Sequence, residues 1–148
     1  SWGGSCFPKD LVEVNNFYNQ DELNLPLISN IIGSNNEHLQ WTINQLRSMK
    51  KNNNLKTIVL VGAAFKEDTD DLRNSPTLDI YNVLNEIGEE VMILDTEIDV
   101  PNYQSIKQLD EVPSNSLLSI MYPLKEELNM NISNYANNNQ CIIYYPWS

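Results

Sequence analysis

The sequence has few of the residues that build metal centres and disulfide frameworks, with two cysteines and one histidine among 148 residues. Cys6, Cys141 and His38 lie far apart in the chain. They do not have the spacing of a zinc site, so we expect no metal. Two free thiols are typical of a reducing compartment, so we expect a cytoplasmic protein without disulfides.

Basic residues and long apolar runs are also scarce. The 9 Lys and Arg residues oppose 20 Asp and Glu residues, for a formal net charge of −11. Nucleic-acid-binding domains carry a basic face, so we expect no nucleic-acid partner. No apolar run approaches the roughly 20 residues of a membrane-spanning helix, so we expect no membrane partner. The start, Ser1-Trp2-Gly3-Gly4, has neither Met nor a signal-peptide pattern, which indicates a processed or truncated chain.

Up to a boundary at Asn52–Asn54, the chain has a helical pattern. Pro8 suits the first turn of a helix, and apolar residues from Leu11 keep a helical spacing. A second helix, over about residues 26–51, has an apolar stripe formed by Ile28, Ile32, Leu39, Ile43 and Leu46. A helix of this length is about 35 Å long, more than a small domain buries. We therefore expect part of the stripe to face another subunit or domain.

From residue 54 onward, short β-branched runs alternate with turn residues. A helix is expected from Pro76 to Gly88, with Ser75 as its N-cap. Its face toward the sheet comprises Leu78, Ile80, Tyr81, Leu84 and Ile87. The expected strands are 56–61, 90–94, 116–121 and 141–145. The sequence therefore predicts an α/β fold: a helical segment with a long helix over residues 1–53, then a small Rossmann-like parallel sheet domain over residues 54–148.

Cys6 lies in a segment whose neighbours favour a reactive thiol, Gly3-Gly4-Ser5-Cys6-Phe7-Pro8-Lys9-Asp10. Pro8 places the cysteine just ahead of a helix N-terminus, where the dipole favours a thiolate and Lys9 adds positive charge. Asp10 lies four residues on, where a carboxylate assists proton transfer. The alternative is an inert, buried cysteine.

The segment Val61–Pro76 joins the carboxyl end of a strand to a helix. Ligands of open α/β sheets bind at that edge. Gly62 permits close approach of a ligand, and Lys66 and Arg73 offset phosphate charge. The alternative is a solvated polar loop, because acidic residues crowd this segment.

Together the two segments resemble the UDP-glucose/GDP-mannose dehydrogenase family. The matching residues are Gly3-Gly4-Ser5-Cys6-Phe7-Pro8-Lys9-Asp10 and Gly62-x-Ala64-Phe65-Lys66-x-Asp68-Thr69-Asp70-Asp71-x-Arg73-x-Ser75-Pro76. The resemblance implies an NAD-binding domain, a central region with a dimer-forming helix, and a C-terminal domain that binds the nucleotide of a UDP-sugar. This chain resembles the last two parts. It has no Gly-x-Gly-x-x-Gly motif, so the NAD-binding domain is expected elsewhere in the full-length protein and the chain alone is expected to be inactive.

The resemblance also implies residue roles. Cys6 is the nucleophile, which forms a thiohemiacetal and then a thioester with the sugar C6 carbon, and Asp10 assists proton transfer and hydrolysis. Lys9 and Arg73 lie toward NAD. The residues that line the sugar nucleotide are Trp2, Gly3, Phe65 and Lys66. Trp2 replaces the usual Phe or Tyr, and the end of the chain, Tyr144–Ser148, lacks the usual Asp and Arg.

The substrate expected first is UDP-glucose, followed by UDP-N-acetylmannosamine. GDP-mannose ranks lower, because that subgroup tends to carry Leu where Phe7 stands. A homodimer through the long helix is also implied, as is a place in polysaccharide or capsule biosynthesis. Two other interpretations stay open: a truncated nucleotide-sugar-binding module, and a dimerisation fragment without activity.

Overall fold

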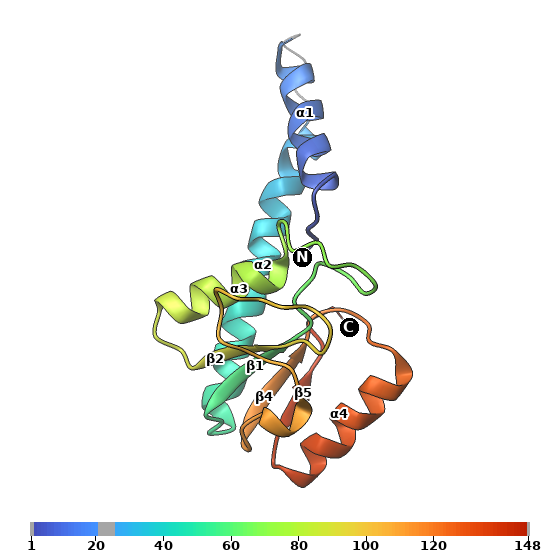
Figure 1. Cartoon of the computed structure of the whole chain (residues 1–148). Helices are drawn as coiled ribbons and strands as arrows, with labels where there is room; N and C mark the ends of the chain where they lie inside the picture. Colours follow the sequence, from blue (N-terminus) through green and yellow to red (C-terminus); the bar gives the residue numbers. More distant parts are fainter. Residues whose placement is uncertain (1, 21–25, 148) are drawn as a thin grey trace.

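The computed structural model describes residues 2–20 and 26–147, with the side chains of residues 18–20, 28 and 29 left out. Ile28, which helical spacing assigns to the apolar stripe of the second helix, therefore has its side chain outside the described set. A stalk of two helices projects from a sheet domain (Figure 1). The predicted α/β class is confirmed.

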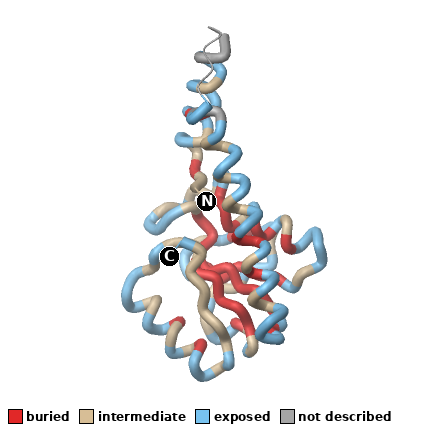
Figure 2. Tube along the Cα trace, turned by 180° about the vertical axis from the view of Figure 1, so that it is seen from behind, coloured by how far each residue is buried: buried red, intermediate tan, exposed pale blue. Residues whose placement is uncertain are grey.

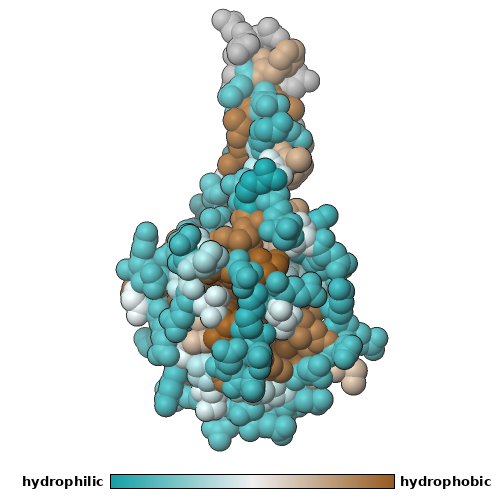
Figure 3. Space-filling model, viewed as in Figure 1, coloured by the Kyte–Doolittle hydropathy of each residue, from teal (hydrophilic) through white to brown (hydrophobic). Residues whose placement is uncertain are grey.

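The stalk consists of α1 (Phe7–Gln20) and the outer part of α2 (Pro26–Asn52), which lie side by side. Its outer end is mostly exposed (Figure 2), and Leu27 there is 79% exposed. Apolar surface follows the stalk (Figure 3). The inner part of α2 is different, because Ile43 and Leu46 are buried in the core beneath the sheet. One helix therefore belongs to both the stalk and the sheet domain.

The sheet has five parallel strands in the order β3-β2-β1-β4-β5. Their bounds are β1 Thr57–Val61, β2 Val91–Leu94, β3 Ser105–Ile106, β4 Ser116–Ile120 and β5 Ile142–Tyr144. The central strand β1 pairs with β2 on one side and β4 on the other. The strand order thus reverses at β1, and the crevice at the carboxyl ends of β1, β2 and β4 is the usual ligand position in such sheets.

Helices cover both faces of the sheet, as the alternation of side chains in β1 requires. Ile58 and Leu60 pack toward α2 and α3 (Pro76–Glu86). Val59 and Val61 pack toward α4 (Glu126–Asn138), which supplies Ile132 and Ala136. A short 3-10 helix, Leu109–Glu111, precedes β4.

The four predicted strands are present, but three other details differ from expectation. Ile87 is 49% exposed rather than packed on the sheet, because α3 ends at Glu86 and Ile87 is its C-cap. Ser75 occupies the N-cap position, but its hydroxyl donates to the Ala63 carbonyl at 2.6 Å instead of capping the helix. Finally, β3 and α4 are elements that were not predicted from the sequence. In the part of the chain that is described, no helix is both long and apolar enough to cross a bilayer.

Candidate functional site

The two sequence motifs lie against each other, although about seventy residues separate them along the chain. The Gly4 N–H donates to the Asn74 carbonyl at 3.3 Å, and the Asn74 side-chain amide donates to the Gly4 carbonyl at 3.1 Å. A Cβ at Gly3 would collide with the Asn74 carbonyl and lie 2.7 Å from Pro76 Cδ. The glycines therefore allow a backbone-to-backbone junction that a larger residue would break.

Phe65 packs under the same junction. Gly4 has a φ of +94°, and a Cβ there would be 3.1 Å from the Phe65 ring. The Lys66 ammonium lies 5.6 Å from the centroid of that ring and is exposed. Gly3, Phe65 and Lys66, all expected to line a sugar nucleotide, are thus neighbours along one junction.

Trp2 is fixed by α2 rather than by either motif. The backbone N–H of Trp2 donates to Asn35 Oδ1 at 2.8 Å, and Asn35 Nδ2 donates to the Trp2 backbone carbonyl at 3.1 Å. The Trp2 indole meets the Phe7 ring edge-to-face at a centroid distance of 4.8 Å. Sequence reasoning missed Asn35, because a single Asn on a polar helix face carries no motif.

Cys6 is exposed immediately ahead of α1. Its carbonyl accepts the Asp10 N–H at 2.9 Å, which is the first turn of the helix. The Cys6 sulfur lies 3.8 Å from the Ser5 hydroxyl. The thiol therefore stands at the positive end of the α1 dipole, where a negative charge is stabilised.

The charged residues near Cys6 form ion pairs with other side chains of the protein. Lys9 lies 3.4 Å from Asp10 and 3.8 Å from Glu13, and both carboxylates, Glu13 first, raise the pKa of Lys9. Arg73 pairs with Asp71 through two contacts of 2.9 and 2.8 Å. This bidentate pairing holds the pKa of Asp71 well below its usual range. Lys9, Asp10 and Arg73 thus lie near Cys6, each with a protein partner.

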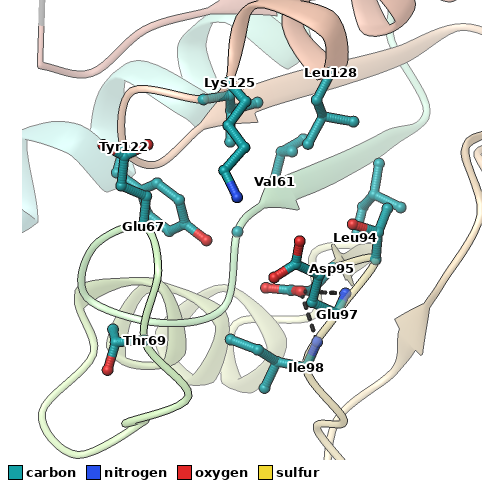
Figure 4. A pocket seen from close by; sticks show the side chains of 13 residues that line it. Val61, Glu67, Thr69, Leu94, Asp95, Glu97, Ile98, Tyr122, Lys125 and Leu128 are labelled. Carbon is teal, nitrogen blue, oxygen red and sulfur yellow. Dashed lines mark hydrogen bonds between the residues drawn. The ribbon is translucent and has the colours of Figure 1, made fainter.

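A separate pocket lies at the carboxyl ends of β1, β2 and β4, where the strand order reverses (Figure 4). Its cavity volume is about 70 Å³, enough for a few water molecules and too small for a nucleoside. Its acidic side chains are Glu67, Asp95 and Glu97, and Lys125 is its one basic side chain among those that line it. Val61, Gly62, Glu67 and Thr69 belong to the segment that the sequence singled out, whereas the sequence motifs gave no sign of Asp95, Glu97, Tyr122 or Lys125.

Asp95 holds the start of the loop after β1 (loop 62–75) by a hydrogen bond. Asp95 is 7% exposed, and its carboxylate accepts three backbone N–H groups: Ala63 at 2.8 Å, Glu97 at 3.0 Å and Ile98 at 2.9 Å. At the other end of the loop, the Ser75 hydroxyl holds the Ala63 carbonyl and the Thr77 hydroxyl holds the Gly62 carbonyl at 2.8 Å. The ends of loop 62–75 are therefore anchored by buried hydrogen bonds.

Tyr122 closes the pocket above Gly62. Burial, and secondarily the carboxylates of Asp95 and Glu97, raise the pKa of Tyr122 to about 12, so its phenol stays protonated at neutral pH. Lys125 pairs with Asp68 at 2.9 Å on the same side of the loop. Loop 62–75 thus has one side toward Cys6 and another toward this pocket.

The end of the chain lies over the carboxyl end of β4. The Trp147 indole N–H donates to the Ile120 carbonyl at 2.9 Å, and its ring meets Tyr145 edge-to-face at 5.4 Å. Aromatic side chains of Tyr145 and Trp147 therefore follow the last strand, in the segment that lacks the Asp and Arg usual in the family. Within residues 2–20 and 26–147, no group of three or more His, Cys, Asp or Glu side chains is placed to hold a metal ion.

The two cysteines are expected to react at different rates, because their surroundings differ. Cys6 is exposed, whereas Cys141 is partly buried and its thiol donates to the carbonyls of Pro113 and Asn139 at 3.7 and 3.6 Å. With limiting iodoacetamide at neutral pH, we expect Cys6 to be alkylated about ten times faster or more, read by mass spectrometry of the digested protein. Equal rates would contradict an accessible, reactive Cys6.

Comparison with known proteins gives one consistent answer. Residues 59–137 match the model of the UDP-glucose/GDP-mannose dehydrogenase family, UDP binding domain. The UDP-glucose 6-dehydrogenase TuaD of Bacillus subtilis is 31% identical over 105 residues, which are 71% of this chain and 23% of that protein. The GDP-mannose 6-dehydrogenase of Pseudomonas aeruginosa is 27% identical over 133 residues, 78% of this chain and 30% of that protein. The chain therefore spans less than a third of these relatives.

Solved structures share the fold. A crystal structure of a ternary complex of GDP-mannose dehydrogenase from Pseudomonas aeruginosa aligns with a TM-score of 0.79 at 23% identity, over 98% of this chain and 36% of that one. The UDP-D-ManNAc dehydrogenase of Pyrococcus horikoshii aligns with a TM-score of 0.76 at 23% identity, over 98% of this chain and 34% of that one. Both alignments include the stalk as well as the sheet domain, because each covers nearly the whole chain.

Proposed function

Because the chain belongs to the UDP-glucose/GDP-mannose dehydrogenase family, we propose that it is the part of an NAD-dependent nucleotide-sugar dehydrogenase that carries the nucleophile and the nucleotide-binding surface. The reaction is oxidation of the C6 alcohol of a UDP-sugar to a uronic acid, with UDP-glucose as the first candidate. The junction of Gly3 and Gly4 with Asn74 is the observation that supports this most directly. At this junction Gly4, two residues before Cys6, packs against the Phe65 ring, which belongs to the second motif.

In the proposed reaction, Cys6 acts on the aldehyde formed from the C6 alcohol. Its thiolate attacks the carbonyl carbon, forming a C–S bond and a thiohemiacetal, which a second oxidation converts to a thioester. Asp10, whose N–H closes the first turn of α1 on Cys6, assists proton transfer. Water then cleaves the C–S bond, which releases the acid and returns the thiol.

The cofactor is expected to come from a separate domain. When bound, NAD⁺ supplies the hydride acceptor for both oxidations. The pocket of this sheet does not fit a dinucleotide, because it holds about 70 Å³ and the carboxylates of Glu67, Asp95 and Glu97 face it. Lys9 and Arg73 are the cations near Cys6 that suit a cofactor phosphate. To bind there, the phosphate must compete with Glu13 for Lys9 and with Asp71 for Arg73.

The nucleotide is expected to lie along the junction, with Lys66 offsetting its phosphate charge. In titration calorimetry of the isolated chain, we expect Lys66→Ala to weaken UDP binding about tenfold, because a charge-assisted hydrogen bond is lost. Lys125→Ala is the matched control, since it removes a cation from the pocket side of the loop, and UDP binding should persist. An equal loss in both variants would count against the junction as the binding surface.

The same titrations with UDP-glucose, GDP and NAD separate the alternatives. Binding of UDP and UDP-glucose, without NAD, supports the nucleotide-binding part of a larger enzyme. Tighter binding of GDP would shift the substrate toward GDP-mannose, as some relatives suggest. Binding of none would leave a dimerisation role for the stalk, whose apolar surface includes the 79% exposed Leu27 and suits a homodimer. A cytoplasmic location stays a prediction.

A further inference from the structure

Asn74 binds both backbone polar groups of Gly4, which lies two residues before Cys6. The Asn74 backbone carbonyl accepts the Gly4 N–H at 3.3 Å, and the Asn74 side-chain amide donates to the Gly4 carbonyl at 3.1 Å. Figure 1 shows the start of the chain beside the loop that ends at Asn74. One residue of the second motif therefore ties the segment that carries Cys6 to loop 62–75.

The backbone conformation of Asn74 explains why asparagine suits this position. Its φ is +51°, in the left-handed region that asparagine adopts more readily than most residues with a side chain. Glycine adopts the same conformation but has no amide to donate. Aspartate has nearly the same shape, but its ionised carboxylate only accepts hydrogen bonds and would face the Gly4 carbonyl. The contact with Gly4 therefore uses both the backbone and the amide of asparagine.

Asn74 is itself fixed to the carboxyl end of β1. The next residue, Ser75, is buried, and its hydroxyl donates to the Ala63 carbonyl at 2.6 Å. The Ala63 N–H donates in turn to the buried Asp95 carboxylate at 2.8 Å. Asn74 therefore keeps its place relative to the sheet, and its two hydrogen bonds pass that placement on to Gly4.

The Cys6 segment has a second support, on the stalk side. Asn35 of α2 binds the backbone N–H and the backbone carbonyl of Trp2 at 2.8 and 3.1 Å. Cys6 itself is exposed, so packing does not fix it. The Asn35 contact places the segment relative to α2, whereas the Asn74 contact places it relative to loop 62–75.

We propose that Asn74 is a positioning residue for Cys6, which acts through Gly4 to hold the nucleophile in one place relative to loop 62–75. This inference rests on the proposed roles of Cys6, Phe65 and Lys66. Its hydrogen bonds limit the positions that the sulfur can take beside a nucleotide sugar bound to the loop. Misplacing a reacting group by about 1 Å costs on the order of a hundredfold in rate, so the placement of this sulfur matters to the reaction.

Asn115 makes the same kind of contact at the opposite end of the sheet and provides a matched control. Its φ is +62°, and its side-chain amide donates to the Asn54 carbonyl at 3.1 Å. Its backbone carbonyl accepts the Lys56 N–H at 2.9 Å. Asn115 lies just before the amino end of β4, whereas Asn74 ends the loop that follows β1. Asn115→Asp therefore removes the same amide from an equivalent contact without touching the Cys6 segment.

The test measures the mobility of the Cys6 segment in the whole chain carrying Cys141→Ala, with a nitroxide spin label on Cys6. In Asn74→Asp we expect the rotational correlation time of the label, read by electron paramagnetic resonance, to shorten about twofold or more. In the unlabelled chain, hydrogen exchange of the Gly4 N–H, followed by NMR, should be about tenfold faster, because the contact that protects it is weakened. Asn74→Gly keeps the backbone conformation and the carbonyl acceptor, so it should give an intermediate change in both measurements.

Asn115→Asp should lower the melting temperature about as much as Asn74→Asp, but leave the label mobility and the Gly4 exchange rate unchanged. If Asn74→Asp does not fold, Asn74→Gly serves instead. Unchanged label mobility and unchanged Gly4 exchange in the Asn74 variants would overturn the proposal. Equal changes in Asn115→Asp would also overturn it, since they would reflect a general loosening of the fold. None of these measurements involves UDP or NAD, so failure of nucleotide binding and failure of this proposal are separate results.

Discussion

Replacing Asp95 with alanine is expected to lower the free energy of unfolding by about 3–5 kcal/mol. Asp95 is 7% exposed, and its carboxylate accepts the backbone N–H groups of Ala63, Glu97 and Ile98 at 2.8–3.0 Å. Alanine leaves these donors without their acceptor, and the Ala63 N–H lies in a fully buried residue where water does not replace it. Urea denaturation followed by circular dichroism measures the loss.

Two further variants make the Asp95 result specific. Asp95→Asn keeps an acceptor for Glu97 and Ile98 but turns an amide N–H toward the Ala63 N–H, so we expect a partial loss. Glu97→Ala removes an exposed carboxylate from the same pocket, keeps its backbone donor, and should change stability by less than about 0.5 kcal/mol. A loss below about 1 kcal/mol in Asp95→Ala would mean that these hydrogen bonds are not what holds the loop.

The Asp95 variant is also expected to weaken UDP binding, although Asp95 lies on the far side of the loop from Cys6. Asp95 holds the Ala63 N–H, and Ser75 holds the Ala63 carbonyl. Loss of the first contact loosens the start of the loop that carries Phe65 and Lys66. The affinity loss should therefore accompany the stability loss.

Gly62→Ala is expected to cost about 2–4 kcal/mol, the second large effect. Gly62 has a φ of +96°, where a side chain is strained, and a Cβ there would lie 2.5 Å from the Tyr122 ring. A methyl group at residue 62 therefore requires the Tyr122 ring to move from its place at the pocket. Thermal or urea denaturation measures the change.

Two other glycines distinguish the cost of backbone strain from the cost of the collision with Tyr122. Gly88 also has a positive φ, of +79°, but no atom lies within 4 Å of its Cβ position, so Gly88→Ala should show the strain alone, about 1 kcal/mol. Gly33 lies inside α2 with open space around it, so Gly33→Ala should stabilise the protein by about 0.5–1 kcal/mol. If Gly62→Ala were no worse than Gly88→Ala, the collision with Tyr122 would be refuted.

Strong periodicity made much of the fold predictable. Residues 58–61 are all apolar, the run from 57 to 61 is mostly β-branched, and β1 is buried throughout. Ile80 and Leu84 repeat at helical spacing and are fully buried. By contrast, α4 is rich in Asn, a weak helix former, and is helical because Ile132 and Ala136 pack on the sheet. Tertiary packing of that kind leaves little trace in local sequence.

The residues of the candidate site were also predictable only in part from the sequence. Cys6 and loop 62–75 were recognisable as motifs, but their contact was implied by family resemblance and not by spacing. Asn35 and Asp95 were missed because each acts through one hydrogen-bond geometry that depends on a distant backbone segment. Motifs predict which residues matter, whereas the three-dimensional fold decides which residues hold them in place.

Because α2 belongs to both the stalk and the sheet domain, it links the two mechanically. The same helix holds Trp2 through Asn35 in the stalk and buries Ile43 and Leu46 under the sheet. Rotation of the stalk relative to the sheet is therefore expected to bend α2, and the Gly33-Ser34 pair is the kind of place where helices bend. Because Asn35 of α2 holds Trp2, four residues before Cys6, α2 also sets where the backbone that carries Cys6 lies relative to the sheet.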